Sequence, residues 1–292
     1  MNSIVISGHN GFIGSSLTSR LKKFHIIGIT NKKRKKEKNV TSIVKNVNKV
    51  NNTDVKHSFQ TLIHLAAVSD ISFCNANPKT CYEVNVNGTN NMLEIARKND
   101  ANIIFASSSH VYGNPIKLPI KENDKINPSS VYSSSKIMAE TLCETYAKNY
   151  GLNITVLRLF SIYGPNSPQH NIILNIIKQI KTKQTISLGN INAKRDFIHI
   201  DDVTDAFNRV IRSQKKGFNV YNISTNKSTS IKEICKKLTK HSKTKIPIVS
   251  NKNKLRKNDI PEIRGNFLKF KKDYEWNSKI KIEQGLKMTF NK

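Results

Sequence analysis

The sequence lacks any apolar run long enough to cross a membrane. No stretch of its 292 residues approaches the roughly 20 apolar residues that a transmembrane helix needs. Its first residues, Met1-Asn2-Ser3-Ile4-Val5, have neither the charged lead nor the apolar core of a secretion signal. We therefore expect the protein to stay in the cytoplasm.

Cysteine is also scarce. The four cysteines stand at irregular spacings, and no two form the C-x-x-C pair found in zinc and redox sites. This pattern indicates free thiols in a reducing compartment, with neither a disulfide framework nor a metal site. The residues are Cys74, Cys81, Cys143 and Cys235.

Acidic residues are few beside basic ones. Aspartate and glutamate number 20 against 49 lysines and arginines, which gives a formal net charge of +29. A field of that size attracts polyanions such as nucleic acid or acidic lipid. The lysines are nevertheless scattered through the chain among many asparagines, as a coding bias would produce, and they neither gather on one helix nor alternate with aromatic residues. We therefore expect no specific nucleic-acid partner and no membrane partner.

The sequence does contain a regular alternation of strand and helix patterns. Apolar runs predict strands at 3–7, 25–30, 61–65, 103–106 and 154–160, with a less regular segment around 43–47. Helices are predicted at 12–23, 78–98, 131–150, 172–183 and 203–212, and another begins at the capping box of Ser230 and Glu233. Such alternation is typical of parallel β-α-β units. We predict an α/β fold, a Rossmann-type doubly wound parallel sheet with a smaller C-terminal α/β lobe.

A glycine-rich turn joins the first predicted strand to the first helix. Gly8, Gly11 and Gly14 form G-x-x-G-x-x-G. Glycines there let the backbone turn tightly and approach a pyrophosphate, and the helix N-terminus adds partial positive charge. This context favours dinucleotide binding over an ordinary glycine-rich turn.

The second predicted strand ends without a carboxylate. NAD sites place an acidic residue there to hold the ribose 2′-hydroxyl, whereas residues 28–34 read GITNKKR. Cations at that point suit a 2′-phosphate, so NADP(H) is favoured and NAD(H) remains possible. The alternative is a solvated basic loop.

Tyr132 and Lys136 stand four residues apart near the start of a predicted helix, hence on one face. Lowering the pKa of a tyrosine by roughly three units takes about 4 kcal/mol of differential charge stabilisation. A nearby ammonium and a positively charged nicotinamide could supply it. Hydroxyls in the segment SSSHVYG at 107–113 follow a predicted strand, where they would face a cofactor cleft.

The chain resembles the extended short-chain dehydrogenases/reductases that modify nucleotide sugars. The match runs almost end to end, with motifs in that family's order and spacing. They are SGHNGFIG at 7–14, HLAA at 64–67, NVNGT at 85–89, SSSHVYG at 107–113, YSSSK at 132–136, LRLFSIYGP at 157–165 and RDFIHIDDV at 195–203. The resemblance implies a dinucleotide-binding domain over 1–160 with 196–222, and a substrate lobe over 161–195 and 223–292.

This resemblance implies a role for each site residue. Tyr132 would be the catalytic acid/base, Lys136 would bind the nicotinamide ribose and lower the tyrosine pKa, and Ser108 would hydrogen-bond the reacting sugar oxygen. The implied cofactor site comprises Gly8, Gly11, Phe12, Ile13, Gly14, Asn31, Lys32, Leu65, Ala66, Ala67, Asn85, Tyr132 and Lys136. The implied substrate site comprises Ser108, Ser109, Tyr132, Ser161, Arg195 and Arg256.

The two arginines resemble the family's contacts to the nucleotide diphosphate, and an arginine fork suits paired phosphate oxygens. The alternatives are an interdomain ion pair for Arg195 and a surface cation for Arg256. The segments 188–197 and 255–287 look most like GDP-mannose 4,6-dehydratases and GDP-6-deoxy-D-mannose reductases. His110 stands where those dehydratases carry glutamate, so 4,6-dehydration is not expected. Asn266 replaces the family's usual aspartate.

The leading hypothesis is therefore a 4-ketoreductase that reduces C4 of a nucleoside-diphosphate-linked 4-keto-6-deoxyhexose. One alternative is a nucleotide-sugar 4-epimerase with tightly bound NAD. Another, from a different class, is a non-catalytic dinucleotide-binding sensor on the same fold. The resemblance also implies a homodimer.

Overall fold

The chain divides into two compact units. The computed structural model describes residues 3–32, 38–182, 185–255 and 259–291. The first unit comprises Met1–Val111, Pro128–Arg158 and Thr204–Tyr221, and the second comprises Tyr112–Asn127, Leu159–Val203 and Asn222–Lys292. The segment Tyr112–Asn127, which the sequence interpretation includes in 1–160, therefore groups with the second unit.

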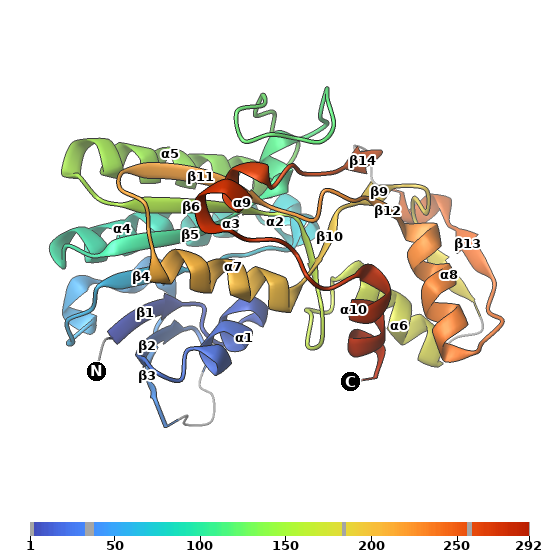
Figure 1. The fold of residues 1–292 in the computed structure, drawn as a ribbon, viewed down its shortest axis with the longest axis horizontal. Coiled ribbons are helices and arrows are strands. Elements are labelled where there is room, and N and C mark those ends of the chain that lie inside the picture. The colour runs from blue at the N-terminus through green and yellow to red at the C-terminus, as the bar shows by residue number, and fades with distance from the viewer. Residues whose placement is uncertain (1–2, 33–37, 183–184, 256–258, 292) are drawn as a thin grey trace. The chain divides into compact units, whose positions relative to one another are not determined.

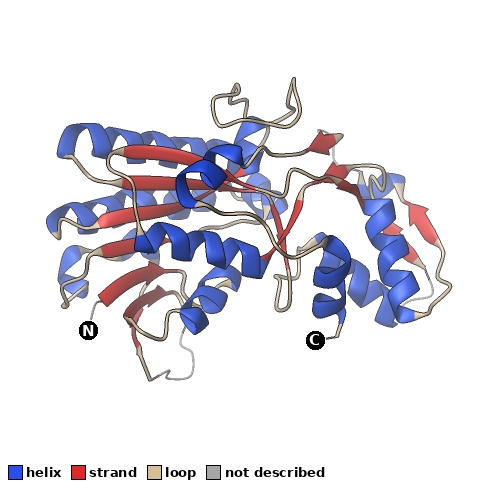
Figure 2. Cartoon of the chain, viewed as in Figure 1, coloured by secondary structure: helices blue, strands red, loops and turns tan. Residues whose placement is uncertain are grey.

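A seven-stranded sheet organises the first unit, and its order is β11-β6-β5-β4-β1-β2-β3 (Figure 1). Every pairing from β5 across to β3 is parallel. Helices lie in front of the strands and behind them (Figure 2). The strands are β1 (Ser3–Ser7), β2 (His25–Thr30), β3 (Val40–Val44), β4 (Thr61–His64), β5 (Asn102–Ser108), β6 (Ile154–Leu159) and β11 (Phe218–Ile223). The Rossmann-type fold class predicted from the sequence is confirmed.

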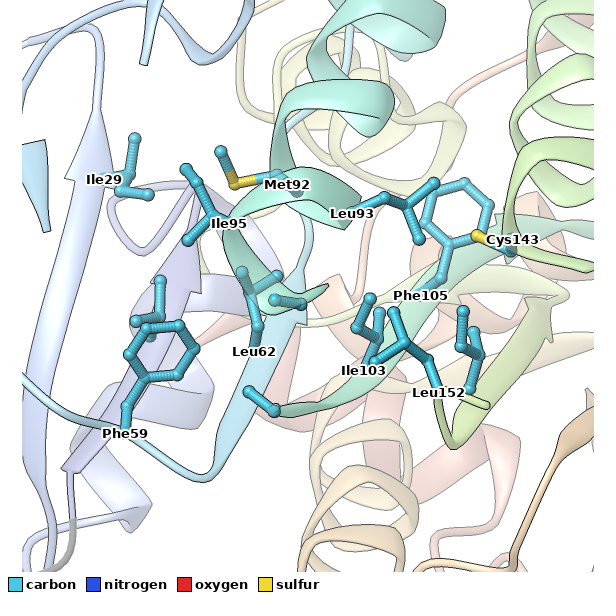
Figure 3. Close-up of a cluster of buried hydrophobic side chains, with 14 of the residues drawn as sticks. Ile29, Phe59, Leu62, Met92, Leu93, Ile95, Ile103, Phe105, Cys143 and Leu152 are labelled. Carbon is cyan, nitrogen blue, oxygen red and sulfur yellow. The ribbon is translucent and has the colours of Figure 1, made fainter. Parts of the chain in front are cut away.

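The inner strands are buried along almost their whole length. Every residue of β4 and β6 is buried, as are all but the first residues of β1, β2 and β5. Continuous apolar runs of this kind belong to parallel strands covered on both faces. Figure 3 shows the cluster in which Leu62 and Ile103 of the sheet pack near Met92 and Leu93 of α4.

The last residue of each of three neighbouring strands has a polar side chain. Ser7 is the last residue of β1, His64 of β4 and Ser108 of β5. Because these strands are adjacent and parallel, the three side chains lie along one edge of the sheet. Ligands of open α/β sheets bind outside this carboxyl edge.

Helix α5 (Val131–Tyr150) has the bounds that the sequence predicts. The Ser130 hydroxyl accepts the Ser133 N–H at its start, and Gly151 ends it with φ of 69°. Both features are ordinary helix signals. Within the part of the chain that the structure describes, no helix combines the length and apolar character needed to cross a membrane. The first unit also holds α1 (Phe12–Arg20), α2 (Ile71–Ala76), α3 (Pro78–Tyr82) and α4 (Gly88–Lys98), and α7 (Ile200–Arg212) spans the boundary between the units.

The long helix predicted over 78–98 is interrupted. A π-helical turn, Glu83–Asn87, separates α3 from α4. Such a turn widens the backbone spiral by one residue and is frequent at functional sites. It turns the Asn85 amide onto the backbone of Val68, whose N–H and carbonyl both bond to it at 2.8 and 3.0 Å.

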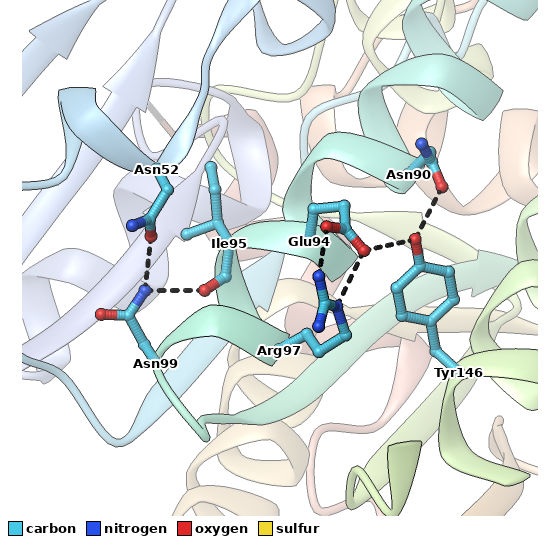
Figure 4. Close-up of polar contacts among 7 residues, drawn as sticks. All are labelled: Asn52, Asn90, Glu94, Ile95, Arg97, Asn99 and Tyr146. Carbon is cyan, nitrogen blue, oxygen red and sulfur yellow. Dashed lines mark hydrogen bonds and ion pairs between the residues drawn. The ribbon is translucent and has the colours of Figure 1, made fainter. Parts of the chain in front are cut away.

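Polar contacts join α4 to α5 at the edge of their apolar interface (Figure 4). The Tyr146 hydroxyl donates to Glu94 at 2.8 Å, and Arg97 donates two hydrogen bonds to the same carboxylate at 3.0 and 2.9 Å. These bonds lower the pKa of Glu94 to about 2, with Arg97 the larger cause. The Tyr146 bond to the Glu94 carboxylate therefore links the two helices by a charge-assisted hydrogen bond as well as by apolar packing, while Arg97 supports Glu94 from the same helix.

The second unit has its own apolar core. Ile173, Ile176 and Ile177 of α6 pack with Ile234 and Leu238 of α8. Three small sheets accompany it, in the orders β10-β7, β12-β9-β14 and β13-β8. Its strands are β7 (Ser161–Tyr163), β8 (Ile186–Leu188), β9 (Lys194–Arg195), β10 (Phe197–His199), β12 (Thr229–Ser230), β13 (Ile248–Ser250) and β14 (Glu262–Ile263). Its helices are α6 (Ile172–Thr182), α8 (Ile231–Ser242), α9 (Leu268–Tyr274) and α10 (Ile282–Phe290).

Candidate active site

The glycine-rich turn after β1 forms a close-packed cradle at the start of α1. Gly8 has φ of 74°, and a Cβ there would lie 2.8 Å from the Ala66 nitrogen. A Cβ on Gly14 would collide with the Gly8 carbonyl oxygen. Both positions therefore require glycine. Gly11 is the N-cap of α1 and offers no side-chain cap, and the first turn of the helix holds no acidic residue. The N–H groups of this turn fit an anion such as a pyrophosphate.

Five further residues of the predicted cofactor site lie at the start of α1 and directly after β4. Phe12 and Ile13 open α1, and Leu65, Ala66 and Ala67 follow β4 directly. The Leu65 and Ala66 N–H groups donate to Ser7 Oγ at 3.2 and 3.3 Å, so the two loops are tied together.

The end of β2 carries no carboxylate. Asn10 donates its side-chain amide to Thr30 Oγ1 at 3.1 Å and to the Lys32 carbonyl at 3.2 Å, which fixes the turn at Asn31. Lys32 is exposed, whereas Lys33 and Arg34 lie outside the described residues. A hydroxyl and an exposed ammonium thus replace the acidic residue typical of NAD sites.

Ser108 and Tyr132 meet inside the first unit. Both side chains are buried, with exposed fractions of 7% and 8%. Burial raises the pKa of Tyr132 to about 12, while a hydrogen bond with Ser108 opposes that rise. The phenol therefore keeps its proton at neutral pH. Ser109, beside Ser108, is buried as well.

Lys136 is buried one helical turn beyond Tyr132. Its Nζ donates to the Ala106 carbonyl at 2.8 Å and lies 4.8 Å from the centre of the Phe105 ring. Desolvation lowers its pKa to about 8, and the Glu140 carboxylate acts in the opposite direction. A buried ammonium of this kind is typical of functional sites.

Glu140, one further turn along α5, belongs to a buried ion pair that sequence reasoning missed. Its carboxylate accepts Arg158 Nη2 at 2.7 Å, and the two side chains are 7% and 5% exposed. The Ser107 hydroxyl also donates to Glu140. The signal was an arginine inside the apolar strand Ile154–Leu159, with a carboxylate four residues after Lys136. The carboxylate and the guanidinium neutralise each other, and this ion pair lies one helical turn from the Lys136 ammonium.

Asn85 is engaged in protein contacts. Besides Val68, its amide donates to Ser135 Oγ at 2.9 Å, and the Ser135 hydroxyl donates to the Tyr132 carbonyl at 2.7 Å. The side chain thus connects the loop after β4 to helix α5. Its expected contact with a cofactor stays a prediction.

His110 faces the tyrosine from the segment after β5. The two ring centres are 6.3 Å apart at an interplanar angle of 72°, and the His110 N–H donates to Ser108 Oγ at 3.2 Å. An imidazole therefore lies beside Tyr132 at the position where the dehydratases of the resemblance carry a carboxylate.

The expected diphosphate contacts belong to the second unit. The Arg195 guanidinium donates to Asp259 Oδ1 at 2.9 Å and to the Ile260 carbonyl at 2.8 Å. It thus forms an ion pair within its own unit, and its contact with a diphosphate stays a prediction. The Ser161 N–H donates to the Asp196 carbonyl at 3.0 Å. Arg256 lies outside the described residues.

The match to a family model decides the family. The chain matches the model described as "NAD dependent epimerase/dehydratase family" over residues 4–224. The chain belongs to this family. The resemblance drawn from the sequence motifs is thereby confirmed.

Relatives within the epimerase/dehydratase family carry two kinds of activity in their names. The chain is 33% identical to the "Putative UDP-glucose 4-epimerase" of Methanocaldococcus jannaschii, covering 79% of each chain. It is 28% identical to the "GDP-6-deoxy-D-mannose reductase" of Pseudomonas aeruginosa, covering 77% of each. Its fold is similar to that of "MoeE5 in complex with UDP-glucuronic acid and NAD", with a TM-score of 0.93 at 22% identity over 99% of this chain and 98% of that one.

The buried ammonium of Lys136 predicts how the stability of the unliganded protein depends on pH. Its pKa of about 8 in the folded protein lies below the ordinary lysine value of 10.5. The folded protein therefore loses this proton at lower pH than the unfolded chain, so this group makes stability rise as pH increases from about 8 to 10.5. Urea unfolding of the wild type and of Lys136→Met is measured from about pH 7 to pH 10. Above pH 8 the free energy of unfolding of the wild type should rise relative to that of the variant. Parallel curves would contradict the burial of the charge.

Proposed function

We propose that the enzyme reversibly oxidises C4 of a sugar carried on a nucleoside diphosphate, and that it is a 4-epimerase. The observation that carries this proposal is the grouping of Ser108, Tyr132 and Lys136 at the carboxyl edge of the sheet, all buried. The name of the 33% identical relative supports an epimerase. The sequence alone favoured the reductase, and the comparison shifts that preference.

The residues of the first unit fit a dinucleotide. The glycine cradle would hold its pyrophosphate, because a Cβ at Gly8 or Gly14 would fill the space that the backbone needs. Lys136 would hold the nicotinamide ribose through its ammonium. Bound in this way, the dinucleotide supplies the hydride acceptor and donor for C4.

Tyr132 and Ser108 would then handle the proton at the sugar oxygen. The phenol lies in a dry environment, where its proton is held until a positive charge arrives beside it. With the Lys136 ammonium and an oxidised nicotinamide nearby, Tyr132 would take the proton from the C4 hydroxyl and later return it. Ser108 would hold the same oxygen by a hydrogen bond throughout.

An epimerase also needs the sugar to turn while its nucleotide stays bound. We propose that the second unit holds the nucleoside diphosphate through Arg195, with Ser161 nearer the sugar. The guanidinium keeps its Asp259 partner at 2.9 Å, which orients the fork. Both residues fall within the substrate lobe predicted from the sequence, which comprises 161–195 and 223–292.

The second candidate is the 4-ketoreductase, favoured by a specific observation. No carboxylate stands at the end of β2 among the described residues Thr30–Lys32. Such a site accepts a 2′-phosphate, and NADP(H) is the usual coenzyme of a net reduction. Coenzyme choice therefore distinguishes the candidates.

Coenzyme retention tests the epimerase proposal. Protein purified without added coenzyme should release close to one equivalent of NAD on denaturation. It should interconvert UDP-glucose and UDP-galactose, or another C4 pair, with no net change in nicotinamide absorbance. Stoichiometric consumption of NADPH by a nucleotide-linked 4-keto-6-deoxyhexose, with no epimerisation, would replace the epimerase by the reductase.

Replacing Tyr132 by phenylalanine tests the acid/base assignment. Loss of the proton-transferring hydroxyl should reduce turnover by roughly 10²- to 10⁴-fold, while dinucleotide affinity changes by less than about twofold. Tyr150→Phe is the matched control, since Tyr150 lies on the same helix and is 54% exposed. Normal turnover of Tyr132→Phe would remove the residue from the mechanism.

A further inference from the structure

His64 occupies a buried position between the glycine turn and helix α4. The side chain is 2% exposed and stacks on Phe105, with ring centres 5.5 Å apart. Nδ1 lies 2.6 Å from Ser7 Oγ, and Nε2 lies 2.9 Å from Thr89 Oγ1. We call Ser7, His64 and Thr89 the histidine relay.

The proton on Nε2 follows from the bonds of Thr89. The Thr89 hydroxyl has a single proton, and it lies 2.6 Å from the Asn85 carbonyl oxygen. That carbonyl can only accept, so the hydroxyl donates to it. Thr89 Oγ1 must then accept from His64, and Nε2 carries the hydrogen.

The bonds of Ser7 are consistent with an Nδ1 that carries no proton. The Ala66 N–H donates to Ser7 Oγ at 3.3 Å, and the Leu65 N–H is shared between Ser7 Oγ at 3.2 Å and the Ser7 carbonyl at 3.1 Å. In a neutral ring whose one proton is on Nε2, Nδ1 can only accept, so the Ser7 hydroxyl donates to it across 2.6 Å. A second proton on the ring would leave the Ser7 hydrogen without an acceptor and place a charge in a dry site.

The relay continues to the catalytic helix. Thr89 contacts the carbonyl of Asn85, and the Asn85 amide bonds to Val68 and to Ser135 Oγ. The Ser135 hydroxyl in turn donates to the carbonyl of Tyr132 at 2.7 Å. An unbroken set of hydrogen bonds therefore runs from the residue before Gly8 to the turn of α5 that holds the catalytic tyrosine.

We propose that His64 is a positioning residue that is neutral, with its proton on Nε2. Through its hydrogen bonds, the histidine relay holds the glycine turn and the π turn at Asn85 in fixed positions relative to helix α5. The inference rests on the proposed function only in taking the glycine turn as a dinucleotide site. Imidazole suits the task because it accepts at one nitrogen and donates at the other across a rigid ring. A glutamine amide also carries an acceptor and a donor, but on a longer, flexible chain that does not place them at the positions of Nδ1 and Nε2.

The surroundings of the ring are consistent with a permanently neutral histidine. Burial lowers the pKa of His64 to about 3, and the Lys136 ammonium acts in the same direction. Among the described residues, the ring contacts the Ser7 and Thr89 hydroxyls and the Phe105 ring. The relay should therefore keep its bonding pattern across the physiological pH range.

Nuclear magnetic resonance of the wild-type protein tests the protonation state without any measurement of activity. In ¹⁵N-labelled protein, His64 should show a hydrogen on Nε2, none on Nδ1, and no titration between about pH 5 and pH 8. His64→Gln identifies the resonance. A hydrogen on Nδ1, or a ring that titrates in that range, would overturn the proposal.

Variants of the relay test the positioning role. His64→Gln and Thr89→Val should each weaken NAD binding by about tenfold or more, because each leaves a buried polar partner unsatisfied beside the turn. Thr89→Ser keeps the hydroxyl and should bind NAD within about twofold of the wild type. These affinities do not depend on which sugar reacts, so they separate this inference from the epimerase proposal.

Coenzyme affinity is measured by fluorescence. Each variant is first shown to unfold cooperatively on heating, so that the affinity is that of folded protein. A purely structural role would lower the melting temperature of His64→Gln and Thr89→Val and leave the affinity of the folded protein unchanged. That result would overturn the proposal.

Discussion

The burial of a single ammonium group is the constraint on which the site in the first unit depends. Lys136 is 4% exposed, so its charge is stabilised by neighbouring protein groups instead of bulk water. The Ala106 carbonyl accepts from it, the Phe105 ring lies beside it, and the ion pair of Glu140 with Arg158 lies one turn further along. These partners come from β5, α5 and β6, which therefore have to keep their relative positions for the charge to be tolerated.

The same constraint explains why Tyr132 and Lys136 lie beside strands that are buried along most of their length. Apolar strands exclude water, and dry surroundings raise the pKa of Tyr132 while lowering that of Lys136. The two groups are thus moved toward neutrality before any ligand binds. A positive nicotinamide arriving in such a place acts on the phenol more strongly than it would in water. The polar groups that end β1, β4 and β5 are hydrogen-bonded, and the structure accounts for each of them.

Sequence patterns predicted several elements that depend on local chemistry. The helical pattern over 131–150 predicted α5, and the glycine spacing located the cradle. Strand β3 was read only as an irregular segment because the apolar residues of VTSIV neither alternate nor form one continuous run, and the π turn was hidden inside a helical pattern. The Glu140–Arg158 pair joins residues 18 positions apart, and the His64 contacts join residues 57 and 25 apart. No periodicity reports contacts of that separation, so the supporting residues emerged only from the fold.

The central claim is that the hydrogen at C4 of the sugar moves to a coenzyme held in the first unit and returns. The most direct measurement uses UDP-glucose deuterated at C4 in ordinary water, with the product examined by mass spectrometry and nuclear magnetic resonance. The account predicts that the epimerised product retains deuterium at C4 and forms more slowly than from unlabelled substrate. Loss of the deuterium to solvent during epimerisation would contradict it, because inversion would then proceed by proton exchange with water.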